Sequence, residues 1–330
     1  MNMKQWFADM IAADRKKPLP ILSFPSIQLM NITVRELISS SDLQARGMAL
    51  IAERVDAAAS LSMMDLSVEA ECFGAQVRFS DDEVPTVTGR LVESPEDADA
   101  LVVPAVGSGR TGTYIDAIGK AVKLITDRPV FAGVIGPFSL AGRLMDVSEA
   151  MMNCYDEPEM VHTVLEKVSA FLIDYIKAYR DIGAHGVCMA EPLAGLLPPD
   201  LAGEFSADYV RRIADAVRSD DFALIYHNCG NSTIRTIDSI LSTGADAFHF
   251  GDAIDMREMV PLIPADKVVM GNISPARLFR NGTPEQIAAE TRSLLADCGK
   301  YPNFVISSGC DIPPMSRWEN IDAFFQAALN

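Results

Sequence analysis

The stretch FALIYHNCGN, residues 222–231, joins a continuous run of apolar residues to a polar end that contains His227 and Cys229. A strand that is covered on both faces reads as such an unbroken apolar run, because neither of its faces meets water. Seven further stretches share this form, and each is followed by a helical pattern or a helix-start signal: residues 19–25, 59–69, 128–142, 184–192, 245–252, 267–275 and 304–314.

Eight strand candidates that alternate with helices predict a parallel sheet. In a chain of 330 residues they fit a closed (β/α)8 TIM barrel better than an open doubly wound sheet, and no GxGxxG motif follows the first strand. No linker, charge block or change in composition divides the chain, so we expect one domain over residues 1–330. An N-terminal helical segment precedes the barrel, and residues 69–104 interrupt the rhythm as a β-hairpin excursion. Thr283, Pro284 and Glu285 mark a helix start.

The formal net charge of −17 opposes binding to nucleic acids and to anionic membranes. No apolar run approaches the ~18 residues that a membrane span requires, and the amphipathic N-terminus does not read as a signal peptide. The six cysteines are scattered singly, which is typical of reduced thiols in a cytoplasmic protein. We therefore expect an α/β enzyme of the cytoplasm.

Polar residues gather where the predicted strands end, and this edge of a barrel carries the chemistry in such folds. His227 and Cys229 are two residues apart, so on an extended strand their side chains point to the same face. Cys310 ends the last strand and approaches the same place when the barrel closes. Two cysteines and a histidine suit Zn²⁺ and leave its fourth position open. Taken alone, the His-x-Cys pair is also compatible with a strand whose end is simply buried.

The other histidines and cysteines receive simpler interpretations. His249 is a spare candidate that more often lines a pocket, whereas His162 and His185 are expected to be structural. A cysteine in an apolar stretch usually behaves as a small buried hydrophobe. That interpretation applies to Cys72, Cys154, Cys188 and Cys298.

Several motifs resemble the uroporphyrinogen decarboxylase superfamily and, within it, the zinc-dependent methylcobamide:coenzyme M methyltransferases. They are MDLSVEAECFGAQVRF (64–79), GVIGPFSLAGRLM (133–145), MAEPLAG (189–195) with LLPPDLAGEF (196–205), YHNCGN (226–231) and SSGCDIPP (307–314). The last two are similar to the metal-ligand motifs of the methyltransferases. The resemblance implies a TIM barrel that transfers a methyl group from a methylated corrinoid to a thiol such as coenzyme M, with zinc held by His227, Cys229 and Cys310.

The resemblance also directs attention to residues around the metal. Glu191 is a candidate oxygen ligand or proton acceptor, with helix capping as the alternative, and Asp252 and Asp311 are expected to support the site. Four residues are candidates for contact with the corrinoid, with core packing the alternative for the first and third: Met63, Asp65, Phe138 and Asn272. The loop 106–114 offers Arg110 to an anionic group of the acceptor, or acts as a lid.

A small separate corrinoid protein is the expected partner, because the chain has no Asp-x-His-x-x-Gly pattern for holding the cofactor itself. Two alternatives remain open. One is transfer of methyl to a tetrahydrofolate-type acceptor, which does not require the three metal ligands. The other is a tetrapyrrole enzyme like uroporphyrinogen decarboxylase, or a non-catalytic chaperone that binds a corrinoid. Such decarboxylases grip propionates with an arginine-rich N-terminal motif, and residues 17–31 here contain no arginine.

Overall fold

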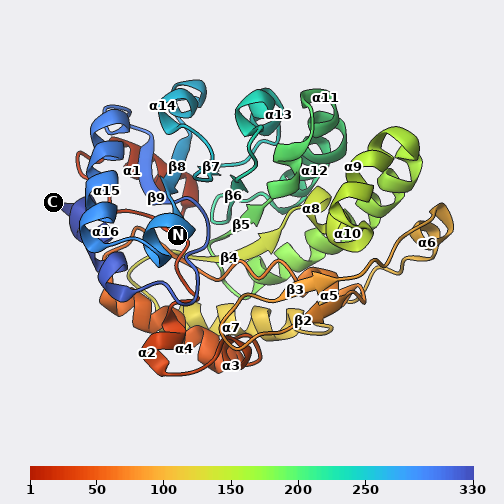
Figure 1. Ribbon diagram of the computed structural model, residues 1–330, viewed down its shortest axis with the longest axis horizontal. Coiled ribbons are helices and arrows are strands. Elements are labelled where there is room, and N and C mark those ends of the chain that lie inside the picture. The colour runs from red at the N-terminus through yellow and green to blue at the C-terminus, as the bar shows by residue number, and fades with distance from the viewer.

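The computed structural model describes residues 1–330 and has a curved sheet of parallel strands at its centre (Figure 1). The strands lie in the order β1-β4-β5-β6-β7-β8-β9, so each strand of this sheet pairs with the next one along the chain. Their bounds are β1 (Ser60–Leu61), β4 (Val130–Ile135), β5 (Gly186–Ala190), β6 (Ala223–Asn228), β7 (Ala247–Phe250), β8 (Val268–Ile273) and β9 (Phe304–Ser308). This is the predicted TIM-barrel-like α/β fold, with seven paired strands.

The eighth predicted strand, residues 19–25, is the exception. This segment is not a strand, although Leu19 donates its N–H to the Ile306 carbonyl of β9 and Pro18 accepts from Ala58 N ahead of β1. It therefore runs between the first and last strands without forming a ladder. Pro18 and Pro20 have no N–H to donate, which explains why regular pairing fails there.

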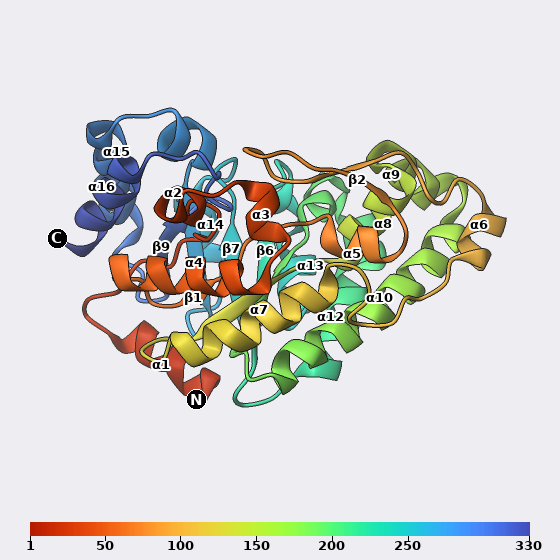
Figure 2. The same cartoon turned by 90° about the horizontal axis from the view of Figure 1, so that it is seen from below.

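Helices lie outside the sheet and follow most of its strands, as Figures 1 and 2 show. In Figure 2, α4 (Ser41–Arg54) and α7 (Thr111–Leu124) run side by side across the outside of the barrel, and these two helices pack against each other. None of the helices combines the length and the apolar character that crossing a bilayer requires. The α-helices are α1 (Met3–Ala12), α2 (Ser26–Met30), α3 (Val34–Ile38), α4 (Ser41–Arg54), α5 (Val68–Cys72), α6 (Pro95–Ala100), α7 (Thr111–Leu124), α8 (Pro137–Met145), α9 (Val147–Asp156), α10 (Pro158–Asp181), α11 (Pro199–Ala202), α12 (Asp208–Val217), α13 (Ile237–Ser242), α14 (Met256–Met259), α15 (Pro284–Cys298) and α16 (Trp318–Leu329).

Short 3-10 and π turns complete the connections, at η1 (Pro192–Leu196), η2 (Gly203–Ala207), η3 (Thr233–Thr236), η4 (Val260–Leu262) and η5 (Pro275–Arg280). The predicted helix start is confirmed at α15, where Thr283 and Gln286 form a capping box and Pro284 takes the first helical position. The predicted hairpin is confirmed as β2 (Gln76–Arg78) paired antiparallel with β3 (Thr86–Thr88).

Two hydrophobic cores hold the barrel together. The larger one, of 79 buried residues, lies between the strands and the outer helices. The smaller one, of 16 residues, fills the barrel interior with alternate strand residues such as Ile225, Ala247 and Val305. Met3 and Phe7 of α1 belong to this inner core. The predicted N-terminal helical segment thus packs against the strand interior, opposite the end where the polar residues gather.

Side chains alternate along each strand, so every second residue faces the barrel interior. Ile225 faces the interior, so His227, two residues later, faces it as well. The register pairs His227 with His249 on the neighbouring strand β7. The two histidines therefore lie side by side in one layer, directly above the inner core.

Candidate metal centre

Three donor atoms from distant parts of the chain meet at the carboxyl end of the sheet. A nitrogen of His227 and the sulfurs of Cys229 and Cys310 all lie within 4.8 Å of one another. The His227 Nε2 to Cys310 Sγ distance is 3.5 Å. His227 is buried and both cysteines are half-buried. The sequence pattern paired the first two residues, and closure of the barrel brings the third to them.

Two glycines allow the loops to come this close. A Cβ placed on Gly251, after β7, would lie 2.2 Å from the Cβ of Cys229, and one on Gly309 would lie 2.7 Å from the Asp252 backbone nitrogen. Carbon atoms in contact normally stay roughly 3.5–4.0 Å apart, so no side chain fits at Gly251 without moving the cysteine. Sequence reasoning missed both glycines, whose only signal is their position directly after a strand.

The two thiols share a hydrogen bond that separates their acidities. The hydrogen bond from Cys310 lowers the pKa of the Cys229 thiol. The same bond, together with burial, raises the pKa of the Cys310 thiol to about 12. The Cys229 thiol is therefore the more acidic of the two.

Behind the sulfur pair, His227 is connected to a chain of buried polar groups. Its Nδ1 lies 2.7 Å from His249 Nδ1, and His249 Nε2 lies 2.8 Å from Ser307 Oγ. His249 is fully buried, which lowers the pKa of its imidazole well below the usual value, so the ring is neutral. His249 thus stands behind the donor group rather than within it.

Glu191, predicted as an oxygen ligand or proton acceptor, caps a helix instead. One carboxylate oxygen accepts from Phe138 N at 2.8 Å and Ser206 Oγ at 2.9 Å, and the other accepts from Ser139 N at 2.9 Å. These amides begin α8, where a carboxylate is favoured by the helix dipole. Both oxygens are in use and Glu191 is not part of the donor group. Glu191 therefore takes the helix-capping position that was its alternative.

Asp252, Asp311 and Asn272 surround the donor group without joining it. Asp252 is exposed and, with Asn272, lines an open cavity of about 370 Å³. Asn272 also donates to the carbonyl of Gly251 at 2.8 Å. Asp311 accepts from Met64 N at 2.7 Å, while its Oδ1 has no hydrogen-bond partner within the protein. Burial raises the pKa of the Asp311 carboxyl well above its usual range.

Two of the residues expected at the corrinoid lie elsewhere. Met63 and Phe138 are buried in the outer core, between the strands and the helices. An apolar side chain on the sheet gains more from this packing than from exposure at the barrel mouth, so both residues take the core-packing alternative.

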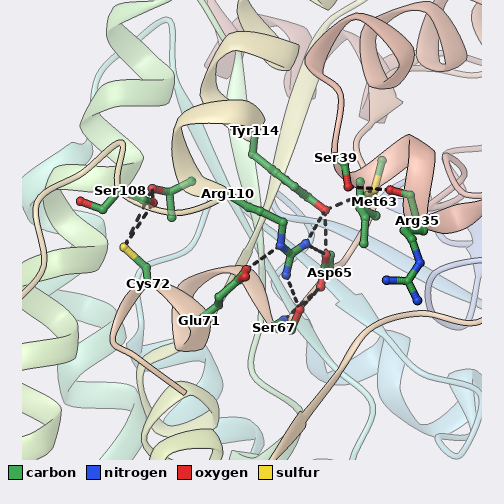
Figure 3. A network of polar contacts seen from close by, with 12 residues as sticks. Arg35, Ser39, Met63, Asp65, Ser67, Glu71, Cys72, Ser108, Arg110 and Tyr114 are labelled. Atoms are coloured by element: carbon green, nitrogen blue, oxygen red, sulfur yellow. Dashed lines mark hydrogen bonds and ion pairs between the residues drawn. The ribbon is translucent and has the colours of Figure 1, made fainter. Parts of the chain in front are cut away.

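Asp65, which follows β1, and Arg110 belong to a polar network shown in Figure 3. Arg110 forms ion pairs with the fully buried carboxylate of Asp65 and with Glu71. Tyr114 donates its hydroxyl to Asp65 at 2.7 Å. Asp65 is thus occupied by the network, and the guanidinium of Arg110 already faces two carboxylates. Neither is free for the corrinoid contact or the anion binding that was expected of it.

The other histidines and cysteines take structural positions. His162 contacts Tyr209 and stacks on Phe205, and His185 accepts from Val130 N. Of the four remaining cysteines, Cys72 is half-buried, and the rest are buried: Cys154, Cys188 and Cys298. None of them belongs to the donor group.

Known proteins resemble this chain in sequence and in fold. A sequence model of uroporphyrinogen decarboxylase (URO-D) matches residues 26–330. The methylcobamide:CoM methyltransferase MtbA of Methanosarcina mazei is 28% identical over 274 residues, which cover 81% of this chain and 78% of that protein. Uroporphyrinogen decarboxylase of Coxiella burnetii is 27% identical over 285 residues, with coverage of 82% and 77%.

The fold has a close match among solved structures. A methyltransferase from Methanosarcina mazei superposes with a TM-score of 0.85 at 23% identity, covering 99% of this chain and 97% of that one. That likeness shows the fold, and the sequence match extends over most of the chain. The chain therefore belongs to the uroporphyrinogen decarboxylase family.

Proposed function

We propose that this protein transfers a methyl group from a methylated corrinoid, carried on a separate protein, to a small thiol such as coenzyme M. The observation that carries the proposal is the convergence of His227, Cys229 and Cys310 at the carboxyl end of the barrel. Support comes from the relative MtbA, whose name assigns it methylcobamide and CoM as substrates. We propose that the protein works in the cytoplasm, where its thiols stay reduced.

The donor group has the chemistry of a zinc site. Two sulfurs and one imidazole nitrogen are ligands that zinc prefers, and three protein ligands are typical of catalytic zinc, which keeps one position for substrate. The donor atoms already lie within 4.8 Å of one another, so small side-chain movements bring them to a common ion. We therefore assign His227, Cys229 and Cys310 as the residues that hold zinc.

When bound, zinc supplies a positive charge that lowers the pKa of an acceptor thiol, which at about 8.5 is otherwise mostly protonated at neutral pH. The residues of this chain tune that effect. Two cysteine sulfurs give electron density to the site, so the acceptor sulfur keeps its nucleophilicity. Because Cys229 and Cys310 are only half-buried, a substrate at the barrel mouth reaches them.

In the transfer, the acceptor sulfur attacks the methyl carbon of the corrinoid. The sulfur–carbon bond forms while the cobalt–carbon bond breaks, both electrons of that bond stay on cobalt, and the thiol proton passes to water. Asp252 is exposed on the loop after β7, and we propose that it and Asn272 lie next to the bound substrates. Asp311 contacts the backbone at Met64 and holds the loop that carries Cys310.

A decarboxylase is the alternative within the family, since the Coxiella burnetii enzyme is about as similar to this chain as MtbA is. A substrate with many carboxylates requires arginines to replace its hydration. Residues 17–31 contain no arginine, and Arg110 already faces Asp65 and Glu71. These features favour methyl transfer.

The test compares wild type, Cys310→Ala and Cys298→Ala with free methylcobalamin and a panel of thiols. Cys298 is a buried cysteine outside the donor group, so it serves as the matched control. We expect stoichiometric zinc and thiol methylation in wild type and the control, and the loss of both in Cys310→Ala. An undiminished rate in Cys310→Ala would remove the zinc mechanism. Release of CO₂ from uroporphyrinogen, without methyl transfer, would establish the decarboxylase instead. Methyl transfer to tetrahydrofolate by zinc-free protein would establish the tetrahydrofolate-type alternative.

A further inference from the structure

The buried chain behind His227 ends on a backbone carbonyl, and this fixes the direction of every hydrogen bond in it. Ser307 Oγ lies 2.7 Å from the Leu19 carbonyl oxygen, which has no proton to give. The single hydroxyl proton of Ser307 is therefore used in donating to Leu19. If the hydroxyl hydrogen pointed to His249 instead, Ser307 Oγ and the Leu19 carbonyl oxygen would be in close contact without a proton between them. The buried carbonyl would then lack a donor, which is unfavourable.

The proton positions on both imidazoles follow from this anchor. Since Ser307 Oγ has already donated its proton, it accepts from His249, and Nε2 of His249 carries a hydrogen. No carboxylate contacts the fully buried His249 ring, and in a neutral ring the other nitrogen, Nδ1, is then an acceptor. His227 Nδ1 must donate to it. The Nε2 of His227, which faces Cys310 Sγ at 3.5 Å, is left with its lone pair.

The anchor exists because the first barrel segment is irregular. Leu19 lies between Pro18 and Pro20, and its carbonyl accepts from Ser307 Oγ rather than from a backbone N–H of the sheet. In a regular parallel ladder that carbonyl would pair with a neighbouring amide. The irregular segment thus leaves a backbone acceptor for the serine.

We propose that Ser307 and His249 are positioning residues that hold His227 in the one tautomer whose Nε2 lone pair is directed at the Cys229–Cys310 pair. This inference rests on the proposed zinc site and deepens it. A ligating histidine usually donates its other N–H to a carboxylate, a carbonyl or water. Here a second histidine takes that place, and a serine and a backbone carbonyl fix its orientation.

The first test is direct and needs no metal and no variant. The chain has four histidines, so ¹⁵N labelling of histidine gives a simple two-bond ¹H–¹⁵N spectrum of the protein, recorded without metal. We expect His227 as the Nδ1–H tautomer and His249 as the Nε2–H tautomer. Assignment of His227 as the Nε2–H tautomer, or of His249 as a doubly protonated ring, overturns the proposal.

The second test measures affinity for Co²⁺ alone, from the visible absorption that cobalt acquires with thiolate ligands. Ser307→Ala removes the anchor, and we expect about 10- to 100-fold weaker binding, the usual effect of losing a group that supports a metal ligand. Ser308→Ala is the matched control, because its hydroxyl accepts from Ile21 N on the same N-terminal segment. Equal affinities in the two variants overturn the positioning role.

The tests also separate this inference from the proposed function. If wild type shows the predicted tautomers but binds neither Co²⁺ nor Zn²⁺, the zinc site is refuted and the hydrogen-bond chain is still supported. Tight binding by wild type and by Ser307→Ala alike keeps the zinc site and refutes the positioning role. In Ser307→Ala the ¹⁵N shifts of His227 should move toward the average of its two tautomers, which a general loss of stability does not produce.

Discussion

Replacing Gly251 by alanine tests whether the close contact between two loops sets the geometry of the donor group. The added Cβ would lie 2.2 Å from the Cβ and 2.6 Å from the Cα of Cys229. Carbon contacts settle at roughly 3.5–4.0 Å, so at least about 1 Å must be recovered. Both obstructing atoms are part of or next to the backbone, so a change of rotamer does not relieve the overlap. The loop after β6 or the loop after β7 has to move.

Such a shift is large compared with what a metal site tolerates. Zinc–sulfur bonds are about 2.3 Å long, and functional sites stay within roughly 0.2 Å of such values. We therefore expect Gly251→Ala to weaken Co²⁺ binding by about 10-fold or more. The strain should also lower the free energy of unfolding by about 1–3 kcal/mol, as overpacking does in well-packed interiors.

Gly119→Ala is the matched control for this experiment. Gly119 lies within α7, and its added Cβ would sit an ordinary 3.6 Å from Ile182 Cβ. Alanine in a helix is favoured over glycine by up to about 1 kcal/mol, so this variant should be at least as stable as wild type and bind cobalt normally. Thermal unfolding and cobalt titration measure both effects. A Gly251→Ala protein that binds Co²⁺ as tightly as Gly119→Ala would refute the argument.

Four further predictions concern groups around the site. Glu191→Ala should lower the free energy of unfolding by about 2 kcal/mol or more, and Glu191→Gln by less, because the amides of α8 lose their acceptor; equal unfolding midpoints for both variants would contradict the capping role. Asp65→Asn should lower the free energy of unfolding by about 3 kcal/mol, since Arg110 loses its buried partner, yet leave the metal stoichiometry at the wild-type value. An Asp65→Asn protein without metal would instead indicate that Asp65 supports the metal site. Burial raises the pKa of Glu69 to about 7, so the native carboxyl keeps its proton where the unfolded one loses it. The stabilising contribution of this proton is complete below about pH 4.5 and is lost as pH rises to 7, about 3 kcal/mol in total. Urea unfolding of wild type and Glu69→Gln should show this fall as a pH-dependent difference between their free energies of unfolding. A difference that does not change with pH would refute it. Finally, chelators should strip zinc and activity more readily at pH 6 than at pH 8, because protons compete with the metal for its ligands. Full turnover after demonstrated zinc removal would exclude the mechanism.

The amino-acid sequence was sufficient for the fold class and for the metal-ligand candidates. Continuous apolar runs between helical patterns reflect strands buried on both faces, and burial is a property that each run records locally. The His-x-Cys spacing places two side chains on one face of a strand whatever surrounds it. The segment 19–25 was misjudged because apolar character predicts burial, whereas the ladder requires N–H groups that its prolines lack.

Only the tertiary structure decided which partners each of these polar residues contacts. Glu191 directly follows β5 and Asp65 lies in the loop after β1, yet one caps α8 and the other pairs with Arg110. A strand-end carboxylate takes the nearest donors, and those come from segments far away in sequence. The contact of His249 with His227 depends on the register of two strands, and its link to Ser307 depends on where a third strand lies. Such three-dimensional neighbours leave no trace in local sequence, because hydrogen bonds are made to whichever group folding brings within reach.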